Sequence, residues 1–344
     1  MHAESELREV LARWQLDGLK PGRRPEVSAL GNGHIHDTYL VETRSARYVL
    51  QRVNEQVFRD GDLVMAQTAR VLDCWRTQDE YQIPDLIRAR DGRDSIRVAS
   101  QLWRLWRFID GTRVVDPLDN LSQATAAGRA FGTFQRVLST LPGPPLKATI
   151  PGFLDLNHYL DAFDAVMDTP RSTPAAEVSV LTEQCRLIEK HRGIGDRLSN
   201  RECLIHGDCK INNLLFDVSG SRVVAIIDFD TVMPGHPAWD FGDLVRSLCL
   251  SSGVFDVDVY AACLAGFGSQ QEDVEIGDMV LAPMYLSLML GIRFLTDHLS
   301  GDVYFKVNAR GENLTRAERQ FALFNSFLAG QDEMMRRAEA SGMG

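Results

Sequence analysis

The 344-residue sequence offers no uninterrupted apolar run of membrane-spanning length. Its longest apolar stretch, residues 279–292, contains Pro283 and falls short of the roughly 20 residues that a membrane-spanning helix needs. The first residues, MHAESELREVLARW, are charged throughout, whereas a signal peptide has an apolar centre. We therefore expect residues 279–292 to form a buried helix, and we expect no membrane partner.

Cysteine is sparse and has no regular spacing. Because the cysteines are scattered through long periodic segments, we expect reduced thiols and a cytoplasmic location. Two of them flank a histidine in Cys203-x-x-His206-x-x-Cys209, but a structural zinc site needs a fourth ligand that the neighbouring sequence does not supply. The six cysteines are Cys74, Cys185, Cys203, Cys209, Cys249 and Cys263.

Positive charge is also in short supply. The chain has 37 Lys and Arg against 47 Asp and Glu, which gives a formal net charge of −10. There is no cluster of basic residues flanked by aromatics, so nucleic acid is not an expected partner. An anionic ligand would need local help from backbone N–H groups, a few cations or a metal ion.

The pattern of apolar residues changes along the chain. Residues 26–53 and 95–109 alternate like strands, with a helical pattern at 60–76 between them. Beyond residue 120 we expect helices at 122–140, 153–167, 177–198, 241–267, 277–299 and 313–340. The sequence predicts an α+β fold with two lobes, a small antiparallel-sheet lobe over 1–110 and a mainly helical lobe over 111–344.

The segment LIHGDCKINNLLFD, residues 204–217, crowds polar side chains between apolar runs. NLLFD and RVVAIIDFD read as an antiparallel hairpin around Gly220. If the turn is centred between Gly220 and Ser221, Asn213 faces Asp228, and an amide and a carboxylate oxygen could share Mg²⁺. Taken singly, Asp and Asn at strand ends more often cap turns than carry chemistry.

Three motifs in order resemble the aminoglycoside phosphotransferase and choline kinase family, relatives of the protein kinases. They are His206-Gly207-Asp208-x-x-x-x-Asn213, Ile227-Asp228 and Gly235-x-Pro237-x-x-Asp240. The chain is more narrowly similar to N-acetylhexosamine 1-kinases in GNGHIHDTYLV, YVLQRVN, IDFDTVMPG and GIRFLTDHLSGDVYFK. The resemblance implies a bilobal protein-kinase-like fold that binds ATP between its lobes and a free sugar in the helical lobe.

The same resemblance assigns roles in phosphoryl transfer. Asp208 would orient the acceptor hydroxyl and take its proton, and Lys210 would neutralise charge on the γ-phosphoryl group. Asn213 and Asp228 would hold Mg²⁺ across the phosphates.

Two neighbouring residues would support this loop rather than react. His206 is expected to hold the loop in place, and Asp240 to hydrogen-bond its backbone. Asp240 also begins a literal Asp-Phe-Gly, but it follows Pro237 at a helix start, so we assign the metal-binding aspartate to Asp228.

In the first lobe the resemblance points to the nucleotide. Gly31 and Gly33 would let backbone approach the phosphates, and Ile109 in the connector would contact the nucleotide. Arg52 stands where kinases place a phosphate-binding lysine, which is a departure from the pattern. The usual helix glutamate is not evident, because Ala66 and Gln67 occupy the expected segment.

For the acceptor, the resemblance carries over His34, Asp208, Thr231, Arg293 and Tyr304 as sugar contacts. Two of these have equally simple structural readings. Arg293 could pair with Asp297 one helical turn on, and Tyr304 could simply pack against Phe305.

The sequence thus predicts a kinase that uses ATP and Mg²⁺ and phosphorylates a sugar, the anomeric hydroxyl of an N-acetylhexosamine first of all. Another acceptor, such as an aminoglycoside, choline or homoserine, is the main alternative, since Asp297, Asp302 and Glu312 could attract a cationic one. A catalytically silent kinase-like binding protein is the second.

Overall fold

The computed structural model describes residues 2–20, 23–31, 35–169, 177–271 and 275–342. The chain divides into two compact units, Met1–Thr112 and Arg113–Gly344, close to the predicted boundary after residue 110. The strand β6 (Thr112–Arg113) lies at this division.

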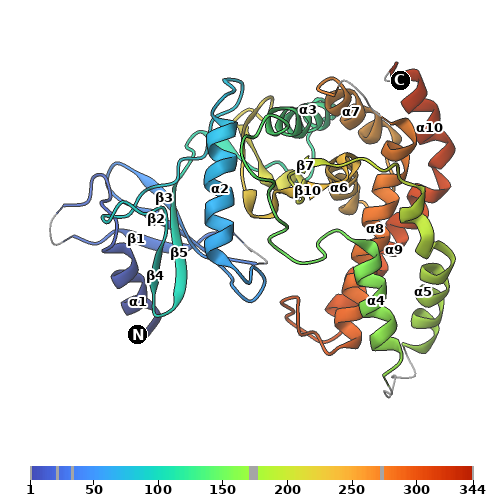
Figure 1. Cartoon of the computed structure of the whole chain (residues 1–344), viewed down its shortest axis with the longest axis horizontal. Helices are drawn as coiled ribbons and strands as arrows, with labels where there is room; N and C mark the ends of the chain where they lie inside the picture. The colour runs from blue at the N-terminus through green and yellow to red at the C-terminus, as the bar shows by residue number, and fades with distance from the viewer. Residues whose placement is uncertain (1, 21–22, 32–34, 170–176, 272–274, 343–344) are drawn as a thin grey trace. The chain divides into compact units, whose positions relative to one another are not determined.

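The first unit is built on a five-stranded antiparallel sheet with the order β1-β2-β3-β5-β4 (Figure 1). The strands β3 and β4 alternate in burial, as the sequence pattern predicts, whereas β5 is buried on both faces over Leu102–Leu105. The bounds are β1 Glu26–Ala29, β2 Asp37–Glu42, β3 Arg47–Arg52, β4 Ile96–Val98 and β5 Gln101–Arg107.

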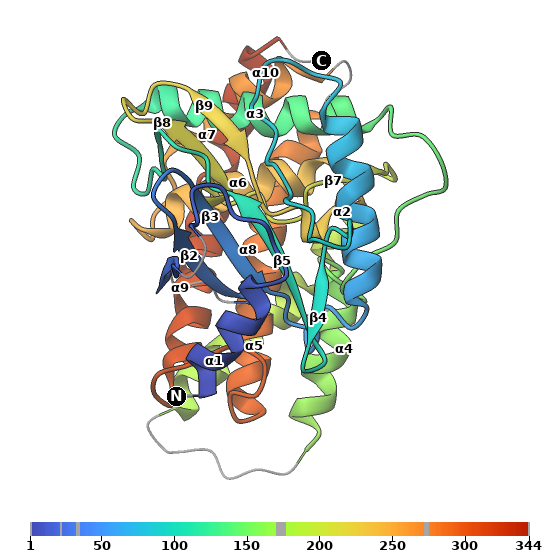
Figure 2. The same cartoon turned by 90° about the vertical axis from the view of Figure 1, so that its left-hand side faces the viewer.

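The two faces of this sheet carry different helices. The helix α1 (His2–Leu11) covers one face, where the residues of the apolar core come from the helix, the segment after it and alternate positions of the strands (Figure 2). The helix α2 (Gly61–Trp75) lies on the other face, where a Cβ at Gly61 would come within 2.6 Å of the Leu102 side chain. The core residues are Val10, Leu11, Trp14, Leu16, Val41, Tyr48, Leu50, Ala89, Ile96, Val98, Trp103 and Leu105.

The second unit is mainly helical. Two of the predicted helices are each divided in two. The predicted helix over 241–267 is interrupted before residue 257, where Asp256 caps a new helix, and the predicted helix over 313–340 is interrupted at Gly330. The helices are α3 Leu121–Leu138, α4 Leu156–Met167, α5 Val178–His191, α6 Pro237–Leu250, α7 Val257–Gly268, α8 Ile276–Leu299, α9 Glu312–Ala329 and α10 Gln331–Ala340. Short 3-10 turns lie at Arg192–Arg197, Ile211–Asn213 and Phe229–Thr231.

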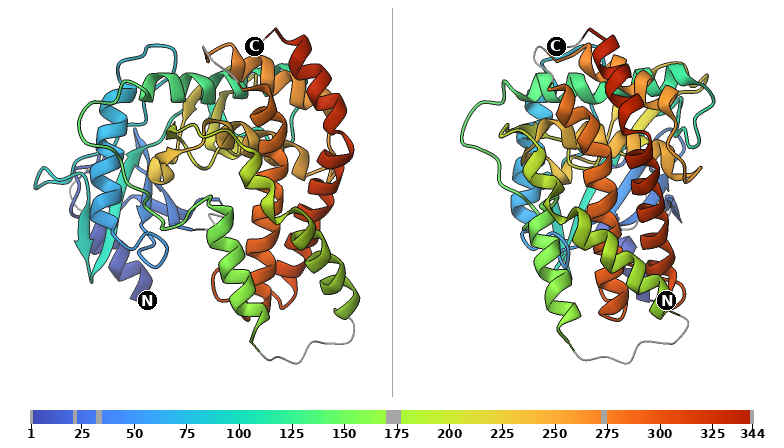
Figure 3. Two further views of the ribbon diagram at one scale, coloured as in Figure 1. Left: turned by 45° about the vertical axis from the view of Figure 1, so that its right-hand side comes forward. Right: turned by 90° about the vertical axis from the view of Figure 1, so that its right-hand side faces the viewer.

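The helix α8, orange in Figure 3, forms the centre of this unit, with α4, α6 and α9 packed against it. By length and composition α8 could cross a membrane, but its most apolar window is 78% buried inside the protein. The expectation that residues 279–292 form a buried helix is therefore confirmed. The helices α3 and α7 also approach closely, since a Cβ at Gly266 would lie 2.0 Å from the Thr125 carbonyl oxygen.

Four short strands carry the polar segment of this unit. β7 (Cys203–Ile205) pairs with β10 (Met233–Gly235), and β8 (Leu214–Asp217) forms the predicted hairpin with β9 (Val223–Ile226). Both of these pairings are antiparallel.

The hairpin register differs by one residue from the prediction. Leu214 faces Ile226, and the Ile227 N–H donates to the Asn213 carbonyl oxygen at 3.0 Å, so Asn213 is opposite Ile227 and not Asp228. One cause is the turn, which the Asp217 carboxylate closes by accepting from the Ser221 N–H at 2.8 Å. The other is a bulge between Leu215 and Phe216, which adds a residue to one strand.

Candidate active site

The loop after β7 is held in place by a buried carboxylate from α6. Asp240, 1% exposed, accepts from the His206 N–H at 2.8 Å and from the Gly207 N–H at 2.9 Å. The Gln135 amide donates to the same carboxylate at 2.8 Å. The expected role of Asp240 as the support of the loop backbone is therefore confirmed.

His206 is also a structural residue of this loop. Its ring is fully buried, its Nδ1 accepts from the Asp208 N–H at 3.3 Å, and its Nε2 lies 3.1 Å from the Ile227 carbonyl oxygen. Both ring nitrogens are thus engaged within the loop and the hairpin, which fits a supporting role and leaves no ring nitrogen for zinc.

Gly207 and Thr231 explain how the loop can turn so tightly. Gly207 has φ +80°, and a Cβ there would lie 2.7 Å from the Thr231 carbonyl oxygen. The Thr231 hydroxyl donates to the His206 carbonyl at 2.9 Å, and the residue is 6% exposed. Thr231 therefore belongs to the support of the loop, and its predicted sugar contact stays a prediction.

Three predicted residues of the loop converge on one another. The Lys210 ammonium lies 2.6 Å from Asp208 Oδ2, and the Asn213 amide donates to the Asp208 carbonyl at 2.8 Å and to Oδ2 at 3.0 Å. The Asp208 side chain remains 25% exposed and that of Lys210 36%. A carboxylate is thus oriented by two donors and still open to a small molecule.

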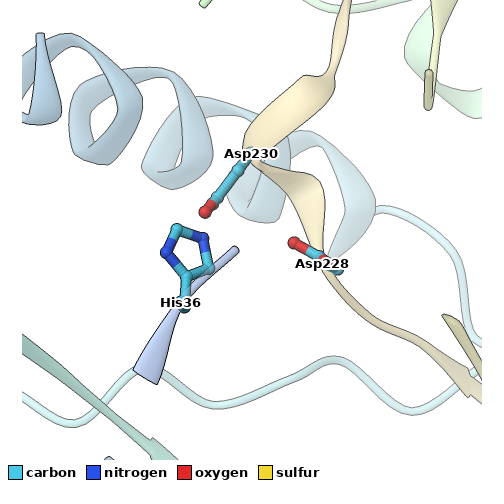
Figure 4. Close-up of side chains that lie close together, drawn as sticks. All are labelled: His36, Asp228 and Asp230. Atoms are coloured by element: carbon cyan, nitrogen blue, oxygen red, sulfur yellow. The ribbon is translucent and has the colours of Figure 1, made fainter. Parts of the chain in front are cut away.

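Two further carboxylates follow β9 (Figure 4). Asp228 adopts a left-handed backbone with φ 70° and ψ 68°, and an oxygen of its carboxylate lies within 4.8 Å of one from Asp230. Asn213 directs its amide nitrogen to Asp208, and among the residues that the structure describes no donor hydrogen-bonds its Oδ1. These oxygens are hard ligands of the kind that Mg²⁺ selects.

The charges around Asp208 and Lys210 fix both groups in their ionised forms. Burial by itself raises the pKa of Asp208, but the Lys210 ammonium outweighs it, with help from Asn213, and the pKa lies below its usual value. Burial lowers the pKa of Lys210, but Asp208, Asp228 and Asp243 together raise it above its usual value. At neutral pH the pair is a carboxylate and an ammonium.

Replacing Lys210 by methionine is expected to raise the pKa of Asp208. The change removes the ammonium that lowers this pKa and leaves the effect of burial, which raises it. Asp208 is predicted to act as the general base, and a general base must be ionised. We therefore expect the acid limb of the kcat/KM profile to move to higher pH, with activity lost earlier as the pH falls. Profiles of the wild type and Lys210→Met test this. Lys190→Met, on the exposed side of α5, is the control, and an acid limb unmoved by Lys210→Met would contradict the assignment.

A second group of predicted residues lies at the far end of α8. The Arg293 guanidinium is surrounded by aromatic rings, with its Cζ 4.8 Å from the Tyr159 ring centroid, 5.4 Å from Phe305, 5.5 Å from Phe153 and 5.8 Å from Tyr304. The alternative ion pair with Asp297 is not formed. Tyr304 does pack edge-on against Phe305 at 4.8 Å, yet it stays 49% exposed.

Asp297 instead binds the backbone of the loop that follows α8, a role that its spacing from Arg293 did not suggest. Its carboxylate, 5% exposed, accepts from the backbone N–H groups of Val303, Tyr304 and Phe305 at 2.8 to 2.9 Å. The Asn313 amide donates to it as well, at 2.8 Å. Asp297 therefore fixes the loop that presents Tyr304 beside Arg293.

Replacing Asp297 by alanine is expected to loosen this loop, because the backbone donors lose their shared acceptor. Because Tyr304 and Arg293 are predicted to contact the acceptor, we expect the KM for the acceptor to rise by about tenfold or more and the KM for ATP to change by less than about twofold. Steady-state kinetics with each substrate varied in turn measure this. Ser300→Ala, whose hydroxyl bonds the Thr296 carbonyl at the same helix end, is the control. A parallel rise in both KM values would count against a role confined to the acceptor.

The predicted residues of the first unit are placed as follows. Gly31 has φ +68° and open space beside it, whereas Gly33 and His34 lie outside the described residues. Arg52 donates through Nε to Asp37 at 2.9 Å, on the neighbouring strand. Ile109 is buried, and its carbonyl accepts from the Thr112 hydroxyl at 2.7 Å.

Comparison with known families gives an extended match. The sequence profile of the phosphotransferase enzyme family, known by the abbreviation APH, matches residues 26–271. This range contains the five-stranded sheet, the loop with Asp208 and the hairpin with Asp228.

The fold is shared with solved structures of low sequence identity. They include an aminoglycoside phosphotransferase from Alicyclobacillus acidocaldarius (14% identity, TM-score 0.64, covering 97% of this chain and 96% of that one) and the microcompartment-associated aminopropanol kinase (18%, 0.63, 99% of each). A spectinomycin phosphotransferase bound to ADP and spectinomycin also matches (13%, 0.59, 99% and 98%). The predicted α+β, protein-kinase-like fold is confirmed.

Curated relatives match over a short stretch. Acyl-CoA dehydrogenase family member 11 of Rattus norvegicus is 42% identical over 45 residues, which are 13% of this chain and 6% of that protein. The mouse protein of the same name is 40% identical over the same length. The chain thus spans a small fraction of the curated relatives it matches.

Proposed function

The chain belongs to the phosphotransferase enzyme family, and we propose that it is a kinase that transfers the γ-phosphoryl group of ATP to the anomeric hydroxyl of an N-acetylhexosamine. A small-molecule phosphotransferase follows from the family. The nucleotide, the metal ion and the acceptor are argued below from the residues of the site.

The transfer step rests on Asp208 and Lys210. The Asp208 carboxylate takes the proton of the acceptor hydroxyl as its oxygen bonds to the γ-phosphorus, and the bond between that phosphorus and the β–γ bridging oxygen breaks to release ADP. The Lys210 ammonium, already beside Asp208, offsets the negative charge on the phosphoryl oxygens. The lowered pKa of Asp208 keeps this base ionised at neutral pH.

The oxygen ligands beside this pair suit Mg²⁺. Asn213 Oδ1 and the Asp228 carboxylate would hold the ion, with Asp230 close to Asp228. When bound, Mg²⁺ neutralises phosphate charge and orients the β- and γ-phosphates. The one-residue shift in the hairpin does not remove Asp228 from the site, because its charge still acts on Lys210.

The observation that carries the choice of acceptor is the environment of Arg293. The structure shows a guanidinium framed by four aromatic rings, and no carboxylate of the described residues forms an ion pair with it. Such a group offers several N–H donors and flat apolar walls, which suit a neutral sugar ring with an acyl oxygen. A cationic acceptor would be repelled by the same charge.

The acidic residues that could have attracted a cationic acceptor are already engaged. The Asp297 carboxylate binds backbone donors, Asp302 accepts from the Asn313 amide at 2.8 Å, and Glu312 accepts from the Asn308 N–H at 2.7 Å. This supports an N-acetylhexosamine over an aminoglycoside or choline.

An acceptor screen tests the proposal. The chain with ATP and Mg²⁺ is assayed for ADP release with GlcNAc, GalNAc, choline, homoserine and kanamycin, and ³¹P NMR of the product reports which oxygen carries the phosphate. We expect turnover with the N-acetylhexosamines and a phosphate on the anomeric oxygen. Strong turnover with choline or kanamycin and none with the sugars would overturn the acceptor assignment, and no turnover with any acceptor would favour the silent binding protein.

A further inference from the structure

One face of α6 runs along the loop that follows β7. Asp240, Asp243 and Ser247 are spaced by three and four residues, so their side chains project from the same side of the helix. Asp240 accepts from two backbone N–H groups at the start of the loop, and the Ser247 hydroxyl accepts from the Ile211 N–H at 3.3 Å. The loop therefore advances along the helix, and Asp243 lies where residues 208–210 pass.

The side chain between the two predicted reacting residues supports this placement. Cys209 is fully buried, whereas the side chains of Asp208 and Lys210 on either side of it are partly exposed. Burial, and after it the charges of Asp240 and Asp243, raise the pKa of the Cys209 thiol. The thiol thus lies beside both carboxylates of α6, and it seats this part of the loop on the helix.

Asp243 is a buried carboxylate with one open oxygen. It is 6% exposed, and its Oδ1 accepts from Nε and from a terminal nitrogen of the buried Arg246 at 2.9 and 2.7 Å. Among the residues that the structure describes, no donor hydrogen-bonds Asp243 Oδ2. Burial raises the pKa of Asp243, and the Arg246 guanidinium, which is charged at every pH that the protein survives, opposes that rise. The pair leaves Asp243 Oδ2 open to a second cation.

Lys210 is a cation on which the Asp243 charge acts. Burial lowers the pKa of Lys210, and the charges of Asp208, Asp228 and Asp243 raise it above its usual value. The Lys210 ammonium donates one N–H to Asp208 at 2.6 Å, and an ammonium has three. Asp243 therefore attracts an ammonium that has donors to spare.

The proposed transfer step gives this attraction a use. When Asp208 takes the proton of the acceptor hydroxyl, it loses the charge that holds Lys210. The phosphoryl oxygens need the ammonium at the same moment. Asp243 takes no part in the proton transfer, so its charge still acts on Lys210 during the step.

We propose that Asp243, held by Arg246, is a positioning residue for Lys210, and that its charge keeps the ammonium in place during the transfer. The inference rests on the proposed role of Lys210 at the γ-phosphoryl group. It assigns to α6 two tasks, since Asp240 holds the backbone of the loop and Asp243 holds the cation that the loop carries.

Asp243→Asn removes the charge and keeps an oxygen that can accept from Arg246. We expect kcat to fall by about tenfold, less than for a group that itself contacts the transition state, with both KM values within about twofold of the wild type. Asp164→Asn is the matched control, because it alters another Asp–Arg pair of the second unit, in which Arg192 donates to Asp164 at 2.6 Å. It should keep kcat within about twofold of the wild type.

Two further variants separate positioning from support of the fold. In the Lys210→Met protein, Asp243→Asn should change kcat by less than about twofold, because the group on which Asp243 acts is gone. Asp243→Leu combined with Arg246→Met removes both buried charges, so this paired variant should unfold near the wild-type denaturant concentration. Its kcat should still be about tenfold below that of the wild type.

The outcomes are distinct. The inference is overturned by a kcat of Asp243→Asn within about twofold of the wild type, by an undiminished effect in the Lys210→Met background, or by a kcat restored together with stability in the paired variant. If Asp243→Asn fails to fold or Lys210→Met turns over too slowly to measure, the kcat of the paired variant decides. A wild type that turns over no acceptor would instead refute the proposed function.

Discussion

Asp208→Asn is expected to lower kcat by about a thousandfold, within the range for loss of a general base. The change keeps the size of the side chain but removes the oxygen that can take a proton. It also leaves the Lys210 ammonium without the carboxylate that lies 2.6 Å away. Rapid-mixing measurements of phosphorylated product would give the effect on the chemical step.

Nucleotide binding should survive this change, since the oxygens of Asn213 and Asp228 are untouched. Calorimetry with a nonhydrolysable ATP analogue and Mg²⁺ measures this in the same protein. Asp332→Asn, on exposed α10, is the control for an Asp-to-Asn change remote from the loop. A kcat within about tenfold of the wild type would place the proton acceptor elsewhere.

Asp240→Ala is expected to have the largest effect on stability. Three donors, the His206 and Gly207 N–H groups and the Gln135 amide, would lose their acceptor in a buried place. Each unsatisfied buried donor costs about 1–3 kcal/mol, so we expect a loss of about 3 kcal/mol or more in the free energy of unfolding of the second unit.

Activity should fall with stability in this variant, because the backbone that carries Asp208 loses its anchor. Denaturant unfolding at 25 °C and kcat at the same temperature measure the two effects. Asp240→Asn keeps one acceptor oxygen but places an NH₂ group against an N–H donor, so it should be intermediate. Asp332→Ala is the control, and an Asp240→Ala protein as stable as that control would contradict the anchoring role.

The local structure of the candidate site could be predicted from sequence. The spacing of His206, Asp208 and Asn213 identified the loop, and the two apolar runs around Gly220 identified the hairpin. The resemblance to a known family then supplied the role of Asp240, which the hydrogen bonds bear out. Short-range patterns of this kind depend on residues within a few positions of one another.

The register of the hairpin could not be predicted, because it depends on the turn that the Asp217 carboxylate closes and on a bulge. A shift of one residue changes which side chains are opposed. The prediction that Asn213 faces Asp228 was therefore wrong by one position, although both residues remain next to the Asp208 loop.

Two other features depend on residues far apart in the chain. The ring of aromatics around Arg293 takes Phe153 and Tyr159 from a segment before α5, and nothing in the spacing of α8 points to them. The face of Arg52 is decided by where α1 packs, which the alternation within β3 alone cannot tell. Sequence reasoning named Arg293 and Arg52 but could not say what surrounds them.

Transfer of label from γ-³²P-ATP to GlcNAc or GalNAc is the most direct measurement of the central claim. The account predicts Mg²⁺-dependent labelling of the sugar by the wild type and a loss of about a thousandfold in Asp208→Asn. Labelling of the sugar at the wild-type rate by the Asp208→Asn protein would contradict it.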